Sequence, residues 1–378
     1  MSTEFEWSEE QRTLRGVVTD YCRRRSAAQQ DAQPGFGRDT WRTLATQLSV
    51  AGLTIDADLG GAGATLLEAG VVAEELGRAL LPTPLVPTVG LAVTALALCS
   101  QDPEARALLG RIADGEVVAT AALADEAGLL DPRVPPLAAR EKDGVWYVDG
   151  VSAFVLEGGA ADVVLCPATT RAGAEPVLLM VHTDGPGLTR EDVVPLDQGR
   201  TQARLTFDGV PATRLATDRP VAEIVGAAVD AAATLLAMEQ TGIARAMLDL
   251  SVDHAKTRMQ FGRAIGSFQA VKHRIADMYV EVENARSTSY HALWALAEGV
   301  DDPALASSLA LTTASGAARK VTRDTVQVHG GIGFTWEHPA HRYLKAAEAN
   351  GTLLGGQRLH ARRLADLALA TPLAGVNV

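Results

Sequence analysis

The hydrophobic pattern of this chain changes its period twice, and that change constrains the fold more than any other feature. Up to about residue 115, apolar side chains recur at helical spacing, as in residues 65–81 and 103–115. Between Glu116 and about residue 215 the apolar runs become short and often β-branched, and turn pairs separate them, such as Asp143-Gly144 and Asp149-Gly150. After Pro220 helical spacing returns in four long segments, at residues 222–258, 266–298, 303–329 and 340–370.

This order predicts an α–β–α architecture with three domains. We expect an N-terminal helical domain at 1–115, a middle antiparallel β-domain at 116–217 and a C-terminal four-helix bundle at 218–378. The long amphipathic helices at the end of the chain also favour an oligomer interface.

Composition argues against several classes of function. The net charge is −12 and the pI is about 5.2, which disfavours nucleic acid and anionic membranes as partners. We find no apolar signal core at the acidic N-terminus and no uncharged run of roughly 20 apolar residues, so we expect no membrane helix. Cys22, Cys99 and Cys166 are far apart and form no CxxC pair, which predicts reduced, buried thiols in a cytoplasmic protein.

The segment "RMQFGRAIGSFQAVKHRIADM" joins two of the predicted long helices. Arg258 ends the first helix, Gly262 and Gly266 break the chain, and Ser267 can cap the helix that carries Gln269. A guanidinium beside helix termini is well placed to bind a pyrophosphate. The alternative interpretation is a helix–turn–helix joint with a surface ion pair.

A second motif, "QVHGGIGF", follows the third of these helices. Gly330, Gly331 and Gly333 allow the backbone to approach a flat or charged ligand, and Gln327 offers an amide donor and acceptor. The alternative is a helix C-cap followed by a tight turn. The histidines nearby show no HxH or HExxH spacing, so we expect no metal site.

Together the two motifs resemble the acyl-CoA dehydrogenase family, flavoenzymes that oxidise fatty-acyl and related thioesters. The resemblance covers nearly the whole chain, including "FEWSEEQRTLR", "DGVWYVDGVSAFVLEGGAADVVL" and "LDQGRTQARLTFDGVPA". It implies an acyl-CoA dehydrogenase-like α–β–α fold, FAD as cofactor, an acyl-CoA as substrate and an electron-transfer flavoprotein as electron acceptor. In the implied reaction a carboxylate removes the α-proton while the β-hydride passes to the flavin.

The resemblance also implies a cofactor site shared between subunits. In this family the two motifs hold the FAD of a neighbouring chain, so a homo- or hetero-oligomer is expected, with a dimer of dimers as its form. The matching cofactor-binding positions are Arg258, Phe261, Gln269, Gln327, Gly330 and Gly331.

The family's usual catalytic glutamate is missing from this chain. Its position falls on Leu354, within "ANGTLLGGQ". Some members keep the acid on the first helix of the bundle instead, and there the matching residue is Ala232. The nearest acids are Asp230 and Glu239, which we name as candidate catalytic bases. The alternative is that both are structural helix carboxylates.

The β-domain departs from the family pattern as well. A stretch of the "TEP-x-x-GSD" type reads "ALADEAGLLDP" here, and a Trp-Ile-Thr stretch reads Phe154-Val155-Leu156, which removes a hydroxyl that would bond the flavin. The residues that in this family bind a neighbouring subunit's FAD are thus present, while those that contact the chain's own flavin ring are replaced. This asymmetry resembles one subunit of the heteromeric acyl-CoA dehydrogenases, which include enzymes of steroid side-chain breakdown.

Three functions follow from these observations. The leading one is FAD-dependent α,β-dehydrogenation of an acyl-CoA by this chain or by an enzyme of which it is a subunit. The second is a catalytically silent subunit that completes the FAD site of a heteromeric enzyme. The third is a non-redox acyl-CoA-binding protein, because a fold does not fix its chemistry.

Overall fold

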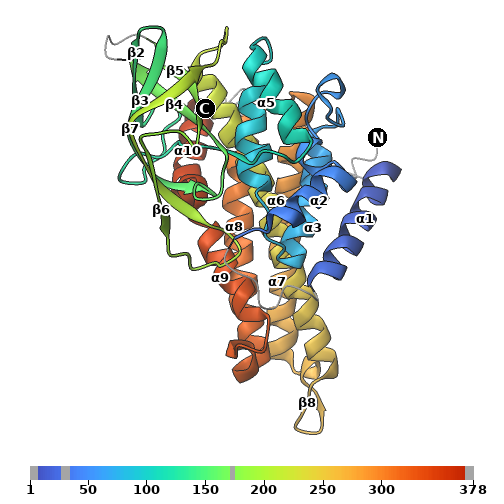
Figure 1. Cartoon of the computed structure of the whole chain (residues 1–378). Coiled ribbons are helices and arrows are strands. Elements are labelled where there is room, and N and C mark those ends of the chain that lie inside the picture. Colours follow the sequence, from blue (N-terminus) through green and yellow to red (C-terminus); the bar gives the residue numbers. More distant parts are fainter. Residues whose placement is uncertain (1–6, 27–34, 171–174, 371–378) are drawn as a thin grey trace, which may run out of the picture.

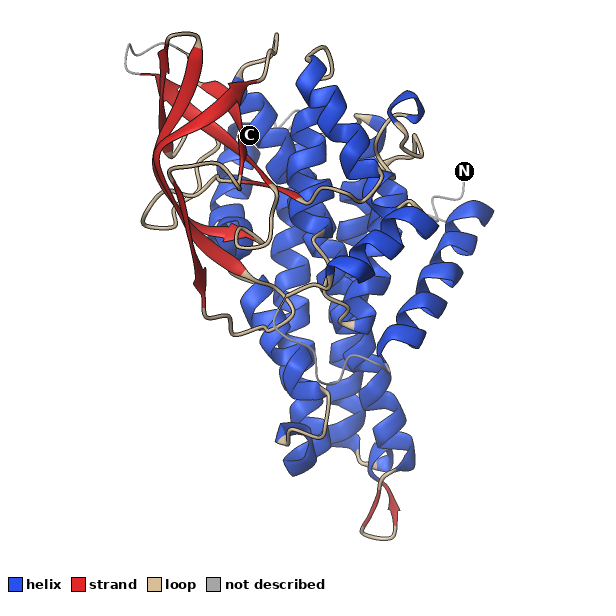
Figure 2. Ribbon diagram, viewed as in Figure 1, coloured by secondary structure: helices blue, strands red, loops and turns tan. Residues whose placement is uncertain are grey.

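The computed structural model describes residues 7–26, 35–170 and 175–370, and its N-terminal part is helical (Figures 1 and 2). Ser8 Oγ accepts the N–H of Gln11 at 3.1 Å, which confirms the predicted start of the first helix. Thr65 and Glu68 form a capping box at the start of the third. The elements are α1 (Glu9–Ser26), α2 (Arg38–Leu48), α3 (Leu66–Ala79), the π-helix η3 (Val86–Val93), α4 (Thr94–Ala97) and α5 (Pro103–Ala113).

The middle of the chain forms one sheet of mixed direction. Its strands are β1 (Ala119–Ala121), β2 (Leu137–Lys142), β3 (Val145–Leu156), β4 (Val163–Thr170), β5 (Val177–His182), β6 (Leu188–Val193) and β7 (Gln202–Arg214). The order is β1-β4-β2-β3-β7-β5, β6 pairs with β7, and β4 also pairs with β5. The prediction of a wholly antiparallel domain is therefore wrong, because β4 runs parallel to both β1 and β2.

The two predicted turn pairs of this domain have different outcomes. Asp143 (φ 53°) and Gly144 (φ 77°) join β2 to β3 with two positive φ angles, as a type I′ turn requires. Asp149-Gly150 is not a turn. It lies inside β3, where Gly150 (φ 128°) sits at a shift in register against β7. A glycine within a strand pattern here marks a bulge instead of a strand end.

The C-terminal part is a helical bundle whose predicted fourth helix is divided. Its helices are α6 (Val221–Thr257), α7 (Gln269–Glu298), α8 (Pro303–His329), α9 (Ala340–Asn350) and α10 (Gly356–Ala370). Leu354 and Gly355 take left-handed φ angles of 54° and 85°, which ends α9 and turns the chain into α10. The fold is otherwise the predicted one.

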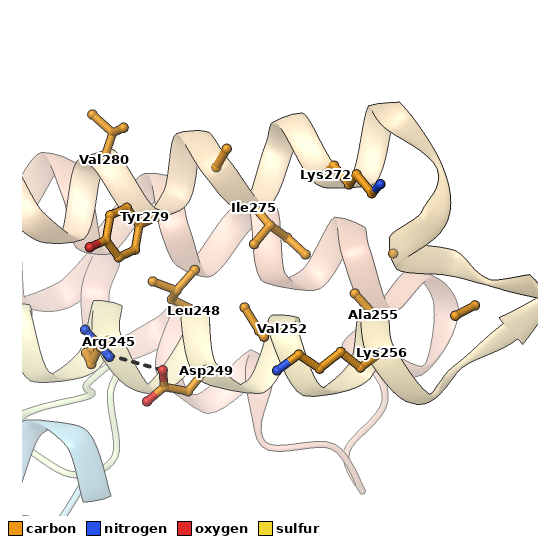
Figure 3. Close-up of a pocket in the computed structure, with 13 residues that line it drawn as sticks. Arg245, Leu248, Asp249, Val252, Ala255, Lys256, Lys272, Ile275, Tyr279 and Val280 are labelled. Atoms are coloured by element: carbon orange, nitrogen blue, oxygen red, sulfur yellow. Dashed lines mark hydrogen bonds and ion pairs between the residues drawn. The ribbon is translucent and has the colours of Figure 1, made fainter.

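A hairpin of β8 (Met259–Gln260) and β9 (Arg263–Ala264) projects beyond the end of the bundle (Figure 1). Ser267 does not cap α7. Its Oγ donates to the carbonyl of Ala264 at 2.7 Å, and Phe268 occupies the N-cap position. Along the bundle from this hairpin, an open groove lies between α6 and α7 (Figure 3).

Helix α6 forms the core of the bundle. By length and composition it could cross a membrane, with a mean hydropathy of 1.7. Asp230 and Glu239 interrupt its apolar sequence, so it has no uncharged run of roughly 20 residues, as expected. Yet 78% of the apolar stretch of α6 that gives this value is buried inside the protein, as in the core helix of a globular fold. Cys22, Cys99 and Cys166 are buried, as predicted.

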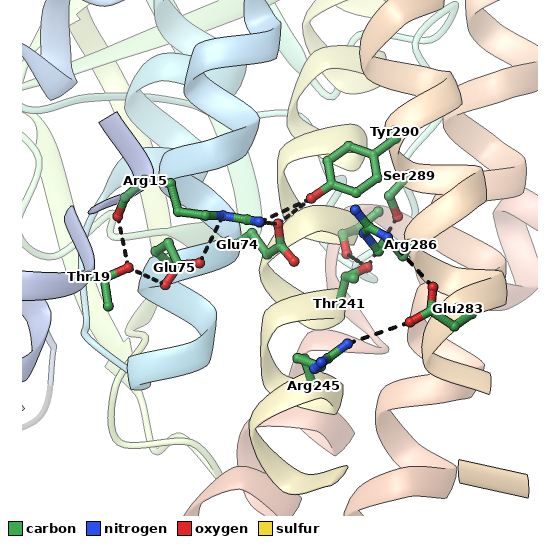
Figure 4. A network of polar contacts seen from close by, with 11 residues as sticks. Arg15, Thr19, Glu74, Glu75, Thr241, Arg245, Glu283, Arg286, Ser289 and Tyr290 are labelled. Carbon is green, nitrogen blue, oxygen red and sulfur yellow. Dashed lines mark hydrogen bonds and ion pairs between the residues drawn. The ribbon is translucent and has the colours of Figure 1, made fainter. Parts of the chain in front are cut away.

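A buried polar network attaches α1 to the rest of the molecule (Figure 4). Arg15 of α1 pairs with Glu74 and, at 3.2 Å, with Glu75, both on α3. Its guanidinium also donates to the Tyr290 hydroxyl of α7 at 3.1 Å. One arginine thus ties the N-terminal helices to the bundle.

Candidate functional site

A cavity of about 480 Å³ lies where the β-domain meets the bundle. It is lined almost entirely by apolar side chains from η3, the β-domain and the break between α9 and α10. The principal ones are Leu91, Leu123, Leu130, Phe154, Leu156, Val193, Leu196, Leu353 and Leu354. Such a cavity fits a flat or apolar ligand and offers few side-chain hydrogen bonds.

Leu354, the residue at the family's glutamate position, lines this cavity in a fixed conformation. Its backbone is left-handed (φ 54°, ψ 35°), which is uncommon for leucine. His360 Nε2 donates to the Leu354 carbonyl at 3.1 Å, and His360 Nδ1 accepts from Ser308 Oγ at 3.2 Å. Burial lowers the pKa of His360 to about 4, so the ring is neutral and holds this geometry near neutral pH. The position therefore places an inert side chain in the cavity wall.

The alternative base position, Ala232, is closed by packing. Ala232 is fully buried, and a Cβ built on Gly90 would lie 2.7 Å from its Cα. The backbones of η3 and α6 approach each other so closely there that no carboxylate side chain fits.

Asp230, our first candidate base, is not among the residues that line the cavity. Its carboxylate pairs with Arg363 of α10 at 3.1 Å and accepts from Ser307 Oγ of α8 at 3.0 Å. Burial raises its pKa above the ordinary value even though Arg363 opposes this. The side chain links three helices, which favours the structural alternative.

Glu239, the second candidate, joins the two walls of the cavity without lining it. Arg200 Nη2, from the loop before β7, donates to Glu239 Oε2 at 2.6 Å. Asn350 Nδ2, at the end of α9, donates to Glu239 Oε1 at 3.1 Å. Arg200 and Asn350 lie 39 and 111 residues from Glu239, so no local pattern could have identified either. Both oxygens are occupied, which again favours a structural role.

Glu348 is the one carboxylate among the described residues that line the cavity. Arg319 and Arg323 of α8 bind its two oxygens, at 2.9 and 2.6 Å. These two contacts hold the carboxylate toward α8. Among the described residues, the cavity thus has no carboxylate without an arginine partner.

The predicted cofactor residues lie together at the exposed end of the bundle. His254 of α6 stacks on His329 of α8 with ring centroids 4.2 Å apart, so the ends of these two helices, which carry Arg258 and Gln327, lie close together. Both side chains are exposed, and Arg258 forms no ion pair with any residue that the structure describes. A Cβ on Gly330 or Gly331 would meet nothing within 4 Å, so their backbone faces open space.

Phe261 and Gln269 complete this end. Phe261 is 91% exposed at the tip of the β8–β9 hairpin, where it and Gly262 take positive φ angles of 53° and 77°. Gln269 is exposed as the first residue of α7, and its amide lies 3.4 Å from His273. Within the described ranges, no cluster of three or more His, Cys, Asp or Glu side chains could hold a metal ion.

The α–β–α order of the three domains is the architecture of one class of flavoproteins. The chain belongs to the acyl-CoA dehydrogenase family, since residues 8–116 match the model for the acyl-CoA dehydrogenase N-terminal domain and residues 223–369 the model for its C-terminal domain. It is 32% identical to acyl-CoA dehydrogenase IpdE2 of Mycolicibacterium smegmatis, over 94% of this chain and 98% of that protein.

Solved structures agree. The fold is similar to that of a variant of the Tcur3481–Tcur3483 steroid ACAD, with a TM-score of 0.84, 32% identity, and coverage of 96% of this chain and 98% of that one. It is also similar to a chain of the ChsE4–ChsE5 complex from Mycobacterium tuberculosis, with a TM-score of 0.85, 29% identity, and coverage of 98% and 100%.

FAD is the cofactor of this family, and the two halves of the site fit it unequally. The bundle end offers an exposed guanidinium and an exposed amide, neither with a partner among the described residues, and an unobstructed glycine turn, which suit the phosphates and adenosine of FAD. The cavity wall at Phe154, Val155 and Leu156 offers the flavin ring no side-chain hydroxyl. The described residues thus suit the phosphates and adenosine at the bundle end better than they suit the flavin ring at the cavity wall.

Proposed function

We propose that this chain is a subunit of a heteromeric acyl-CoA dehydrogenase in which it completes, from across the interface, the FAD site of a second chain. The complementary chain supplies the catalytic base and the contacts to the flavin ring. The assembly carries out FAD-dependent α,β-dehydrogenation of an acyl-CoA thioester in the cytoplasm and passes electrons to an electron-transfer flavoprotein. FAD accepts the β-hydride in that reaction.

One observation carries the proposal. Asp230, Glu239 and Glu348 each form an ion pair with an arginine of the same fold. Arg258, at the end of α6, forms no ion pair with any described residue. A chain that acted alone needs a base within hydrogen-bond reach of the substrate, and neither Leu354 nor Ala232 provides one. The similarity to the two-chain ChsE4–ChsE5 complex and to the Tcur3481–Tcur3483 steroid ACAD supports the heteromer, with a steroid-derived acyl group as one candidate substrate.

The test is expression of the chain alone and together with an acyl-CoA dehydrogenase chain from a neighbouring gene that carries glutamate at the position of Leu354. We expect the chain alone to be colourless, and the purified pair to show a flavin spectrum that bleaches with an acyl-CoA. Replacing the partner's glutamate with glutamine should abolish turnover. A yellow, acyl-CoA-reducible chain on its own would instead establish an autonomous enzyme.

A second function has support from the apolar cavity itself. A pocket of about 480 Å³ without a free carboxylate can bind an acyl group without reacting with it. Saturable binding of an acyl-CoA by the flavin-free chain, with no partner added, would favour this non-redox role.

A further inference from the structure

A buried polar cluster lies beside the cavity, where the β-domain meets the bundle. It consists of Glu157 after β3, Arg200 before β7, Glu239 on α6 and Asn350 at the end of α9. Glu157, Arg200 and Asn350 are buried, with exposed fractions of 1%, 8% and 1%. Each of these three lies within two positions of a residue that lines the cavity, so a shift in the cluster moves the cavity wall.

Hydrogen bonds within the cluster connect the two walls of the cavity. On the bundle side, Arg200 Nη2 donates to Glu239 Oε2 at 2.6 Å, and Asn350 Nδ2 donates to Glu239 Oε1 at 3.1 Å. On the β-domain side, the Thr201 N–H donates to Glu157 Oε1 at 3.3 Å, and the Thr201 hydroxyl contacts Oε2. Since Arg200 and Thr201 are consecutive, the contacts form a continuous bridge from the end of β3 to the end of α9.

Two polar atoms of this bridge are buried without a hydrogen-bond partner among the described residues. They are Arg200 Nη1 and Asn350 Oδ1. A buried polar atom without a partner is unfavourable, so a rearrangement that pairs it is favoured. The planar guanidinium has five N–H donors, and Arg200 therefore has the capacity to bind a second carboxylate.

Arg200 faces more than one carboxylate. The charges of Glu239, Asp197 and Glu157 all act on it. Asp197 is half-buried in the loop before Arg200, and exposed Arg342 of α9 acts on it as well. Burial raises the pKa of Glu157 to about 7, even though Arg200 opposes this shift. Glu157 therefore exchanges its proton near neutral pH, where Arg200 is charged.

We propose that Glu157 is a proton-operated switch that sets how firmly the two walls of the cavity are joined, and so how tightly the cavity binds an uncharged apolar ligand. With Glu157 protonated, Arg200 stays on Glu239 and the bridge to Asn350 is complete. When Glu157 releases its proton to solvent, its carboxylate competes with Glu239 for Arg200 and pairs with the free nitrogen. The bridge then weakens and the walls separate. The inference concerns this chain's own cavity and holds with or without the proposed heteromer.

The experiment measures, at several pH values, the affinity of the purified full-length chain for Nile red, a neutral dye that fluoresces in apolar surroundings. We expect the dissociation constant to rise about tenfold between about pH 5.5 and about pH 8.5, which corresponds to a change of about one unit in the pKa of Glu157 on binding. His360, with a pKa of about 4, stays neutral throughout this range. Leu130→Trp fills the cavity from a half-buried loop position, so the signal that this variant loses comes from the cavity.

Binding and proton uptake must be coupled in both directions. If the dye binds better to the protonated form, its binding near pH 7 takes up protons. Calorimetry in buffers of different ionisation enthalpy measures that uptake.

Three variants separate the switch from other titrating groups. Glu157→Gln cannot ionise and keeps an acceptor for Thr201, so we expect it to bind the dye tightly at every pH. Asn350→Ala removes the far end of the bridge, so we expect it to bind weakly at every pH. Asp230→Asn is the matched control, because Asp230 is a buried carboxylate that pairs with an arginine and does not line the cavity. Its pH profile should follow that of wild type.

Four results would overturn the switch. They are a cavity that binds no dye, a wild-type dissociation constant that does not change with pH, a Glu157→Gln profile that matches wild type, and an Asn350→Ala profile that keeps the full pH dependence. None of these bears on association with a base-bearing chain. Conversely, a chain that shows the predicted pH dependence but fails to associate with such a chain would overturn the proposed function alone.

Discussion

The exposed end of the bundle and the cavity beneath the β-domain differ in whether their polar side chains have partners within the fold. At the bundle end, Arg258 and Gln327 project from two helix ends into open space. At the cavity, Leu354 lies in the wall, and the carboxylates of Glu239 and Glu348 are bound by arginines of the same fold. The first region leaves its polar groups exposed, and the second uses its charges to hold the chain together. In the function proposed above, a second chain supplies what the cavity lacks.

The largest predicted effect tests whether the charges beside the cavity have a structural role. Arg200→Met leaves Glu239 partly buried without its cation, which should lower the free energy of unfolding by about 3 kcal/mol. The double variant Arg200→Met/Glu239→Gln should recover much of that loss. Chemical denaturation of the three proteins measures both values. A loss below about 1 kcal/mol would show that the pair is solvated and contributes little to structure.

A pH effect of similar size comes from the same buried cluster. Burial raises the pKa of Glu157 from 4.5 to about 7, although Thr201 and Arg200 oppose the shift. The folded state therefore holds its proton more tightly than the unfolded state. This contribution is complete below pH 4.5 and is lost as pH rises toward 7, by roughly 3 kcal/mol at about 1.4 kcal/mol per pKa unit.

Glu157→Gln should remove that dependence while keeping an acceptor for Thr201. We expect the variant to be more stable than wild type above pH 7 and to show a flatter profile between pH 4.5 and 7 in thermal unfolding. Parallel profiles for the two proteins would contradict the assignment to Glu157.

A smaller predicted effect tests whether the bundle end binds FAD. Arg258→Ala in the assembled pair should weaken FAD binding about 10- to 100-fold, the range for loss of a charged hydrogen bond. Arg263→Ala is the control on the same hairpin, because its guanidinium already lies over the Phe268 ring, 4.0 Å from the centroid. FAD titration of the apo-complex gives both constants. Equal losses from the two variants would remove the special role of Arg258.

The smallest predicted effect concerns Asp230. Asp230→Asn should change turnover of the assembled enzyme by less than about twofold, because the side chain binds Arg363 and Ser307 away from the cavity. A general base would cost about 10²- to 10⁴-fold. Steady-state rates of the wild-type and variant complexes decide between the two.

Most of the fold could be predicted because hydrophobic period and capping residues are local signals. The change of period near Glu116 and Pro220, and the cap at Ser8, are both visible in short windows of sequence. The parallel pairing of β4 and the break at Leu354 could not be predicted, since each depends on contacts with distant segments.

The site shows the same division. The glycine turn and Arg258 form short motifs that identify the bundle end. The roles of Asp230 and Glu239 depend on Arg363, Arg200 and Asn350, which lie far from them in sequence. A helical carboxylate that acts as a base and one that forms an ion pair look alike in sequence.

The ratio of FAD to protein in the purified pair tests the central claim most directly. The account predicts one FAD for each pair of unlike chains and none in this chain purified alone, because only one of the two interfacial sites has both halves. Two FAD molecules per pair, or a tightly bound FAD in the isolated chain, would contradict it.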